Sequence, residues 1–203
     1  QRQMCIRDRV NGAPARRPED KIDTEKDSVV FRGSPVGYVE YEYFMLNKPA
    51  GVVSATEDRK ERTVLDLIDA KQRKDLFPVG RLDKDTEGLL LITNDGEMAH
   101  RLLSPKKHVD KAYYARVAGR ITEEHVRLFA EGVDIGDEKP TLPAELTVLS
   151  SGEISEIELV IREGRFHQVK RMFQAAGGEV IYLKRLRMGS LVLDGGLEPG
   201  EYR

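Results

Sequence analysis

Charged side chains gather at residues 80–88, immediately before an apolar run at residues 89–92. Five of them could take part in chemistry: Arg81, Asp83, Lys84, Asp85 and Glu87. A carboxylate that lies beside cations stays ionised and can act as a nucleophile or a base. An aspartate in a turn more commonly bonds its own backbone, and spacing alone does not choose among these carboxylates.

Residues 163–173, Glu-Gly-Arg-Phe-His-Gln-Val-Lys-Arg-Met-Phe, form a second candidate segment. Val169, Met172 and Phe173 recur at helical spacing and predict a buried face. The opposite face is basic, so Lys170 or Arg171 could pair with a carboxylate or a phosphate. The alternative is an amphipathic surface helix whose basic face meets only solvent.

Two shorter segments are weaker signals. Tyr113 lies in a strand-like segment beside Lys111, and a tyrosine exposed there could stack on an unpaired RNA base. A half-buried strand tyrosine is the commoner structure. Residues 47–51, Asn-Lys-Pro-Ala-Gly, indicate a turn, which would be a plain loop if it stood alone.

Hydrophobic periodicity predicts the elements that must position these residues. Residues 89–93 show no polar alternation, which indicates a strand covered on both faces. Further strands are expected at 29–31, 41–47, 52–54, 112–117, 144–149, 154–161, 180–186 and 191–193, and helices from 63, at 97–103, 122–131 and 166–176. Because strands and helices do not alternate regularly, we expect an α+β fold around a mostly antiparallel sheet.

Composition narrows the function class. The chain has 203 residues, a net charge of −2 and no apolar run long enough to span a bilayer. A single cysteine, Cys5, excludes an internal disulfide and fits a reducing cytoplasm. The histidines are scattered, so a zinc site is not expected. Basic residues cluster near 101–111, 162–171 and 184–187, which indicates either a phosphate-binding face or solvated surface.

Taken together, four segments resemble the motifs of the RsuA-type ribosomal RNA pseudouridine synthases, in the family's order. They are Asn-Lys-Pro-Ala-Gly at 47–51, Gly-Arg-Leu-Asp at 80–83, Lys-Ala-Tyr at 111–113 and Glu-Gly-Arg-Phe-His-Gln-Val-Lys-Arg-Met at 163–172. The resemblance extends over about residues 41–203. It implies the pseudouridine synthase fold, a central mixed, mostly antiparallel sheet with flanking helices and an active-site cleft.

The resemblance also implies roles for individual residues. Asp83 would be the catalytic aspartate, Tyr113 would stack on the target base, and Lys170, rather than Arg171, would pair with Asp83. Arg81 would help to open the RNA and fill the space of the extruded base. Arg165 and Lys48 would join the substrate-binding residues. The isomerisation conserves all atoms, so neither a cofactor nor a metal is expected.

The expected domain organisation is a remnant of an S4-type RNA-binding domain with a linker at residues 1–40 and a catalytic domain at 41–203. Residues 1–9 lack a clear period and could be foreign to the protein. The expected substrate is one uridine of small-subunit ribosomal RNA, free or in an assembly intermediate, modified by a cytoplasmic monomer. Two alternatives remain: a large-subunit RNA target, or a non-catalytic RNA-binding assembly protein. A metal-dependent hydrolase using Asp83 and Asp85 is disfavoured because further ligands do not cluster.

Overall fold

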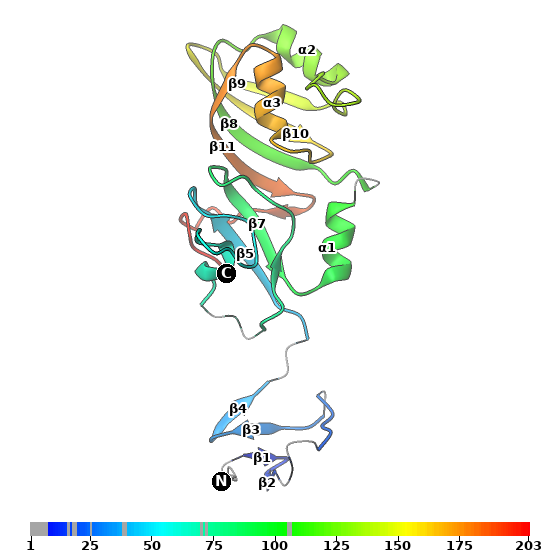
Figure 1. Cartoon of the computed structure of the whole chain (residues 1–203), viewed down its shortest axis with the longest axis vertical. Helices are drawn as coiled ribbons and strands as arrows, with labels where there is room; N and C mark the ends of the chain where they lie inside the picture. The colour runs from blue at the N-terminus through cyan, green and yellow to red at the C-terminus, as the bar shows by residue number, and fades with distance from the viewer. Residues whose placement is uncertain are drawn as a thin grey trace. The chain divides into compact units, whose positions relative to one another are not determined.

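The structure is a computed structural model, which describes residues 8–15, 17, 20–24, 26–37, 40–69, 71, 73–104 and 107–203. The chain divides into two compact units, Gln1–Glu40 and Tyr41–Arg203 (Figure 1). Cys5, Lys106 and most of the segment 1–9 lie outside the described residues, so the predictions made for them are not addressed further.

The first unit contains a small antiparallel sheet, of which the sequence predicts only the strand at 29–31. Its described strands are β1 (Arg9–Val10), β2 (Ala13–Pro14), β3 (Val29–Phe31) and β4 (Ser34–Val36), in the order β2-β1-β3-β4. Two tight turns make this possible, because the backbones at Asn11-Gly12 and Arg32-Gly33 all have positive φ. Pro35 is tolerated in β4 because that strand lies at the sheet edge.

The second unit is an α+β fold around one curved sheet, as the sequence predicts (Figure 1). Its principal strands follow the spatial order β5-β7-β11-β8-β10-β9, while β6 pairs with β7 and β12 pairs with β11. Among the described strands the β7–β11 pair is parallel and the others are antiparallel. The bounds are β5 Tyr43–Lys48, β6 Phe77–Pro78, β7 Glu87–Thr93, β8 Lys111–Ala118, β9 Glu145–Ser150, β10 Ile154–Ile161, β11 Glu179–Met188 and β12 Leu191–Val192.

The helices are α1 (Gly96–Leu103), α2 (Glu123–Glu131) and α3 (Gln168–Ala175). The helix expected from Thr63 is only a 3₁₀ turn at Val64–Leu67, and the strand expected at 52–54 is only a bridge between Val53 and Thr63. Helix α3 begins two residues later than predicted because His167 adopts a left-handed conformation, with φ of 47°. Phe166 and His167 therefore belong to the loop before the helix.

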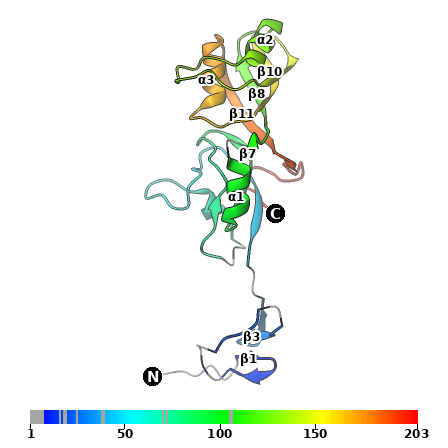
Figure 2. The ribbon, with the colours of Figure 1, turned by 90° about the vertical axis from the view of Figure 1, so that its right-hand side faces the viewer.

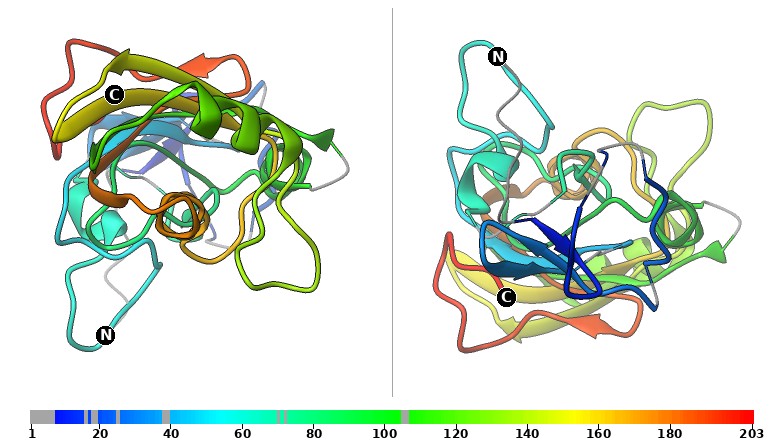
Figure 3. Two further views of the ribbon diagram at one scale, coloured as in Figure 1. Left: turned by 90° about the horizontal axis from the view of Figure 1, so that it is seen from above. Right: turned by 90° about the horizontal axis from the view of Figure 1, so that it is seen from below.

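Strand β7 is covered on both faces, as its sequence predicts. Leu90 and Ile92 belong to the larger core, which includes α2 and α3, whereas Leu89 and Leu91 belong to a smaller core with α1. Figures 2 and 3 show α3 (orange) against one face of the sheet. This double burial makes β7 a rigid support for the loop that precedes it.

The approach of β7 to β11 depends on Gly88. Its φ is +98°, and a Cβ placed there would lie 2.3 Å from the carbonyl oxygen of Arg185. Only glycine combines this conformation with so close a neighbour. In the parallel β7–β11 pair, Glu87 lies opposite Lys184 and Gly88 opposite Arg185.

The C-terminal residues cover the outer edge of β5. The backbones of Met45 and Arg203 exchange hydrogen bonds of 3.0 and 3.1 Å, and Asn47 N donates to the carbonyl of Glu201 at 2.9 Å. Tyr202 packs edge-on against Phe44, with ring centroids 5.7 Å apart. Gly200 N also donates to the Asn47 carbonyl at 2.8 Å, so the C-terminal residues cover this edge as far as the residue before Lys48.

Candidate active site

Asp83 lies on the loop at residues 79–86, between β6 and β7, called here the Asp83 loop. Ser54 fixes the residue before Asp83, because its Oγ donates to the Leu82 carbonyl at 2.9 Å and accepts from Leu82 N at 3.1 Å. Gly51 N donates to the Lys84 carbonyl at 2.7 Å and fixes the residue after it. The backbone is thus held on both sides of Asp83.

Lys48 supports the same loop from inside the fold. The residue is fully buried, and its Nζ donates to the carbonyls of Pro49, Lys84 and Thr86 at 3.0, 3.2 and 2.8 Å. Burial lowers the pKa of Lys48 to about 8, against the opposing influence of nearby carboxylates. An ammonium has three N–H donors, so these carbonyls match its protonated form. The Lys48 charge is therefore directed at the loop backbone.

The charged side chains of the loop and of the start of β7 have different partners. Lys84 pairs with Glu61 at 2.8 Å, and Glu87 accepts from Tyr182 Oη at 2.8 Å. Arg81 is exposed and makes no hydrogen bond or ion pair with the described residues. Among the loop carboxylates, Asp83 and Asp85 both face Lys170.

Lys170 joins the two aspartates. Its Nζ lies 3.2 Å from Asp83 Oδ2 and 2.6 Å from Asp85 Oδ1. His167 Nε2 lies 3.5 Å from the other oxygen, Asp83 Oδ1. The Asp83 side chain lies between the Lys170 ammonium and the His167 ring and, at 26% exposed, is still open to solvent.

The electrostatics of this cluster favour the charged forms of Lys170 and Asp85. Burial by itself would lower the pKa of Lys170, but the hydrogen bond to Asp85 and the charge of Asp83 raise it above the usual value. In turn, the hydrogen bond from Lys170 lowers the pKa of Asp85. The result is a lysine ammonium held between two carboxylates at the end of a rigid strand.

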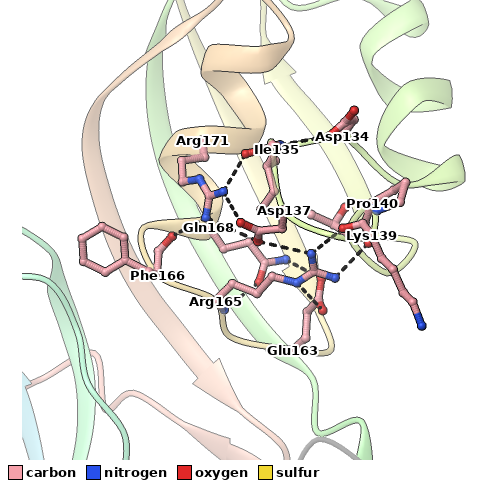
Figure 4. A network of polar contacts seen from close by, with 12 residues as sticks. Asp134, Ile135, Asp137, Lys139, Pro140, Glu163, Arg165, Phe166, Gln168 and Arg171 are labelled. Atoms are coloured by element: carbon pink, nitrogen blue, oxygen red, sulfur yellow. Dashed lines mark hydrogen bonds and ion pairs between the residues drawn. The ribbon is translucent and has the colours of Figure 1, made fainter.

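Arg165 and Arg171, the other basic residues of the segment 163–172, bind partners other than Asp83 and Asp85 (Figure 4). Arg165 donates to Glu163 Oε2 at 3.0 Å and to the carbonyls of Lys139 and Pro140 at 2.7 and 2.8 Å. Arg171 donates to the Ile135 carbonyl at 2.6 Å and pairs with Asp137 at 2.5 Å. We call Arg165, Arg171 and Asp137 the arginine clamp. It fastens residues 134–140 to the start of α3.

Tyr113 lies in β8, on the face of the sheet that forms the larger core. It is only 7% exposed and belongs to the same apolar core as Leu82. Its cross-strand neighbours are Leu159 in β10 and Arg185 in β11. Arg185 is also buried, donates from Nε to the Leu89 carbonyl at 2.8 Å, and has no described partner for Nη2.

Sequence reasoning missed two neighbours of Asp83. The sequence did not predict a contact of Asp85 or His167 with the Asp83 cluster, and both lie in it. The i, i+2 spacing of Asp83 and Asp85 was the sequence signal that could have indicated that both carboxylates face the same partner. The basic cluster at 162–171 is also less available than its sequence indicates, because Arg162, Arg165 and Arg171 are paired with carboxylates of the chain itself.

The described part of the chain contains no group of three or more histidine, cysteine, aspartate or glutamate side chains placed to hold a metal ion. None of its helices combines the length and apolarity needed to cross a bilayer.

Comparison with known proteins shows which family this chain is similar to. The family described as RNA pseudouridylate synthase matches residues 42–175. The chain is 49% identical to an uncharacterised RNA pseudouridine synthase, YtzG, of Bacillus subtilis, over 96% of this chain and 82% of that protein. It is 42% identical to ribosomal small subunit pseudouridine synthase A of Escherichia coli, over 96% and 83% of the two chains. A crystal structure of a pseudouridylate synthase superposes with a TM-score of 0.76 at 40% identity, covering 98% and 84%.

Proposed function

Because this chain belongs to the RNA pseudouridylate synthase family, we propose that it isomerises one uridine of small-subunit ribosomal RNA to pseudouridine. The observation that carries the choice of RNA is the 42% identity, over almost the whole chain, to a protein named for the small ribosomal subunit. The proposed class of reaction is an intramolecular transfer on RNA, which agrees with the family match at residues 42–175.

In the proposed reaction the bond between N1 of the base and C1′ of the ribose breaks, the base rotates, and C5 bonds to C1′. C5 loses a proton and N1 gains one, so the atoms balance without a co-reactant. Asp83 is the proposed catalytic residue. Its carboxylate either attacks C1′ as a nucleophile or removes the C2′ proton as a base. Its partial exposure and fixed backbone suit both routes.

The neighbours of Asp83 receive separate roles in this proposal. Lys170 orients the Asp83 carboxylate, since its Nζ lies 3.2 Å from Asp83 Oδ2. Lys48 positions the Asp83 loop instead of contacting RNA, since its ammonium is buried on backbone carbonyls. Arg165 acts through the arginine clamp, because its donors are directed to the chain itself.

The uridine must leave its base stack to reach Asp83, at a cost of a few kcal/mol. We assign Arg81, which is exposed beside Asp83, to the space that the extruded base leaves in the RNA. Tyr113 is the proposed wall of the base pocket. Because it is 7% exposed, little of Tyr113 meets solvent before the base arrives.

We further propose that the enzyme works as a cytoplasmic monomer on ribosomal RNA or a small-subunit assembly intermediate. Residues 1–40 would be part of an S4-type module that contributes RNA affinity. The alternative readings are the same reaction on large-subunit RNA and a non-catalytic assembly role.

Substitution of Asp83 tests the reaction. Asp83→Asn keeps the size of the side chain and removes its charge, so we expect no pseudouridine from a ribosomal RNA transcript while the Kd for RNA changes less than about threefold. Asp194→Asn is the control, because Asp194 pairs with Arg203 and lies outside the Asp83 cluster. Equal product yield from Asp83→Asn and wild type would show that Asp83 is not catalytic.

Mapping pseudouridine in ribosomal RNA from a deletion strain tests the target. We expect one position of the small-subunit RNA to revert to uridine and to be restored by the wild-type gene but not by Asp83→Asn. An unchanged small-subunit map with a lost position in the large-subunit RNA would favour the alternative target.

A further inference from the structure

Phe166 is an exposed aromatic side chain beside the Asp83 cluster. It is 76% exposed, more than any other large hydrophobic residue among those described. Burying a phenylalanine on folding normally contributes to stability, so an exposed ring that the protein holds in one place indicates a binding surface.

The backbone that carries Phe166 is firmly held. Its carbonyl accepts from Arg171 Nη1 at 3.2 Å. On the preceding residue, Arg165 N donates to the buried Gln168 side chain at 3.0 Å, while the Arg165 guanidinium is fixed in the arginine clamp. Figure 4 shows the Phe166 ring pointing away from this network. The backbone of Phe166 is therefore fixed, and its ring lies outside this hydrogen-bond network.

One face of the ring is already stacked. The Phe166 and His167 rings are 3.8 Å apart between centroids and inclined by 17°. The left-handed conformation of His167 belongs to this arrangement, and its Nε2 lies 3.5 Å from Asp83 Oδ1. The aromatic stack thus leads from the reactive carboxylate outward and ends on the open face of Phe166.

We propose that Phe166 is a stacking platform for an unpaired base that flanks the target uridine. The inference rests on the proposed RNA substrate and adds a contact for its neighbouring nucleotide. RNA is preferred over a protein partner because the ring lies beside the catalytic carboxylate and Lys170, where the target ribose must be placed. Unstacked bases bind to aromatic side chains in this way, and such stacking tolerates any base.

The first experiment compares Phe166→Leu with Phe166→Trp. We expect Phe166→Leu to raise the Kd for a single-stranded oligouridylate and the KM in single-turnover assays by about 5- to 100-fold, with a smaller change in the maximal rate. Phe166→Trp keeps an aromatic face and should stay within about twofold of wild type. Ile154→Ala, an exposed apolar change on β10, is the matched control and should have no effect.

The second experiment removes bases instead of the ring. Synthetic RNA substrates carry one abasic residue at successive positions around the target uridine. At one position the abasic change should weaken wild-type binding as much as Phe166→Leu does, with no further loss when both changes are combined. Additive losses at every position would overturn the platform, as would equal affinities for Phe166→Leu and wild type.

The outcomes separate this inference from the proposed function. If wild type binds RNA but forms no pseudouridine, the reaction fails and the binding data still decide the role of Phe166. If product forms and Phe166→Leu binds and reacts normally, the reaction stands and the platform is wrong. If wild type binds no RNA, both are wrong.

Discussion

Replacing Lys48 with methionine tests how the Asp83 loop is held. Lys48→Met keeps the apolar stem and removes the ammonium that binds the carbonyls of Pro49, Lys84 and Thr86. A buried carbonyl left without its donor costs about 1–3 kcal/mol. Burying the Lys48 ammonium has an opposing cost. The fall of its pKa from 10.5 to about 8 corresponds to about 3 kcal/mol that destabilises the folded wild type. The variant has no ammonium, so this cost is absent from it.

Three carbonyls left without their donor cost about 3–9 kcal/mol, and the variant is relieved of about 3 kcal/mol, so the net loss at pH 7 is about 0–6 kcal/mol. The pH dependence is more decisive. Between pH 8 and 10.5 the unfolded chain keeps a proton on Lys48 that the folded chain releases, so wild-type stability rises with pH. Lys48→Met lacks this titration. The gap in unfolding free energy between wild type and variant should therefore widen, by up to about 3 kcal/mol.

Denaturant unfolding followed by circular dichroism at pH 7, 8.5 and 10 measures this gap. Lys71→Met is the matched control, because Lys71 is exposed and binds one carbonyl, that of Leu65. Tyr182, whose pKa burial and Glu87 raise to about 12, is present in every variant and cancels in the difference. A gap that stays constant or narrows as pH rises would refute the reasoning.

The same variant has a kinetic consequence. Freed from Lys48, the carbonyls on both sides of Asp85 no longer hold the loop, and a shift of about 1 Å at a reacting group can cost about 10²-fold in rate. We expect a fall of this size in the maximal single-turnover rate of Lys48→Met with little change in the Kd for RNA. A large increase in Kd with an unchanged rate would mean that Lys48 contacts RNA directly.

Three further predictions follow from the same geometry. Asp137→Asn should lower stability at pH 7 and weaken RNA binding through Phe166. The hydrogen bond from Arg171 lowers the pKa of Asp137 from 3.8. The difference in unfolding free energy between wild type and variant should therefore vanish as the pH falls through the pKa of Asp137 in the folded protein. Gly88→Ala should destabilise the fold by about 3 kcal/mol or more in thermal or denaturant unfolding, because its Cβ meets the Arg185 backbone, whereas Gly136→Ala, with positive φ but open space, should cost about 1 kcal/mol. Pseudouridine formation should survive prolonged dialysis against EDTA, and loss of activity restored by one added metal would contradict the proposed chemistry.

Much of the fold could be predicted from local sequence. The uninterrupted apolar run at residues 89–93 indicated a strand buried on both faces, and Thr122 and Gly132 marked the ends of α2, because these signals act within a few residues. The start of α3 was misplaced by two residues, because helical spacing does not reveal the left-handed backbone of His167. The four motifs indicated the family, and the resemblance implied that Lys170 pairs with Asp83, but not that Asp85 and His167 join them.

The sequence by itself determined the chemistry that is available: carboxylates before a buried strand, a basic helix and a lysine in a turn. Only the tertiary structure decided which of these groups meet. Lys170 reaches Asp83 and Asp85 across more than 80 residues of chain, while Arg171, its neighbour, turns to Asp137. Lys48 is buried where the backbone of the Asp83 loop supplies the carbonyls of Lys84 and Thr86 to its ammonium. The sign and spacing of charges are local properties, but their partners depend on burial and long-range packing, which no short segment contains.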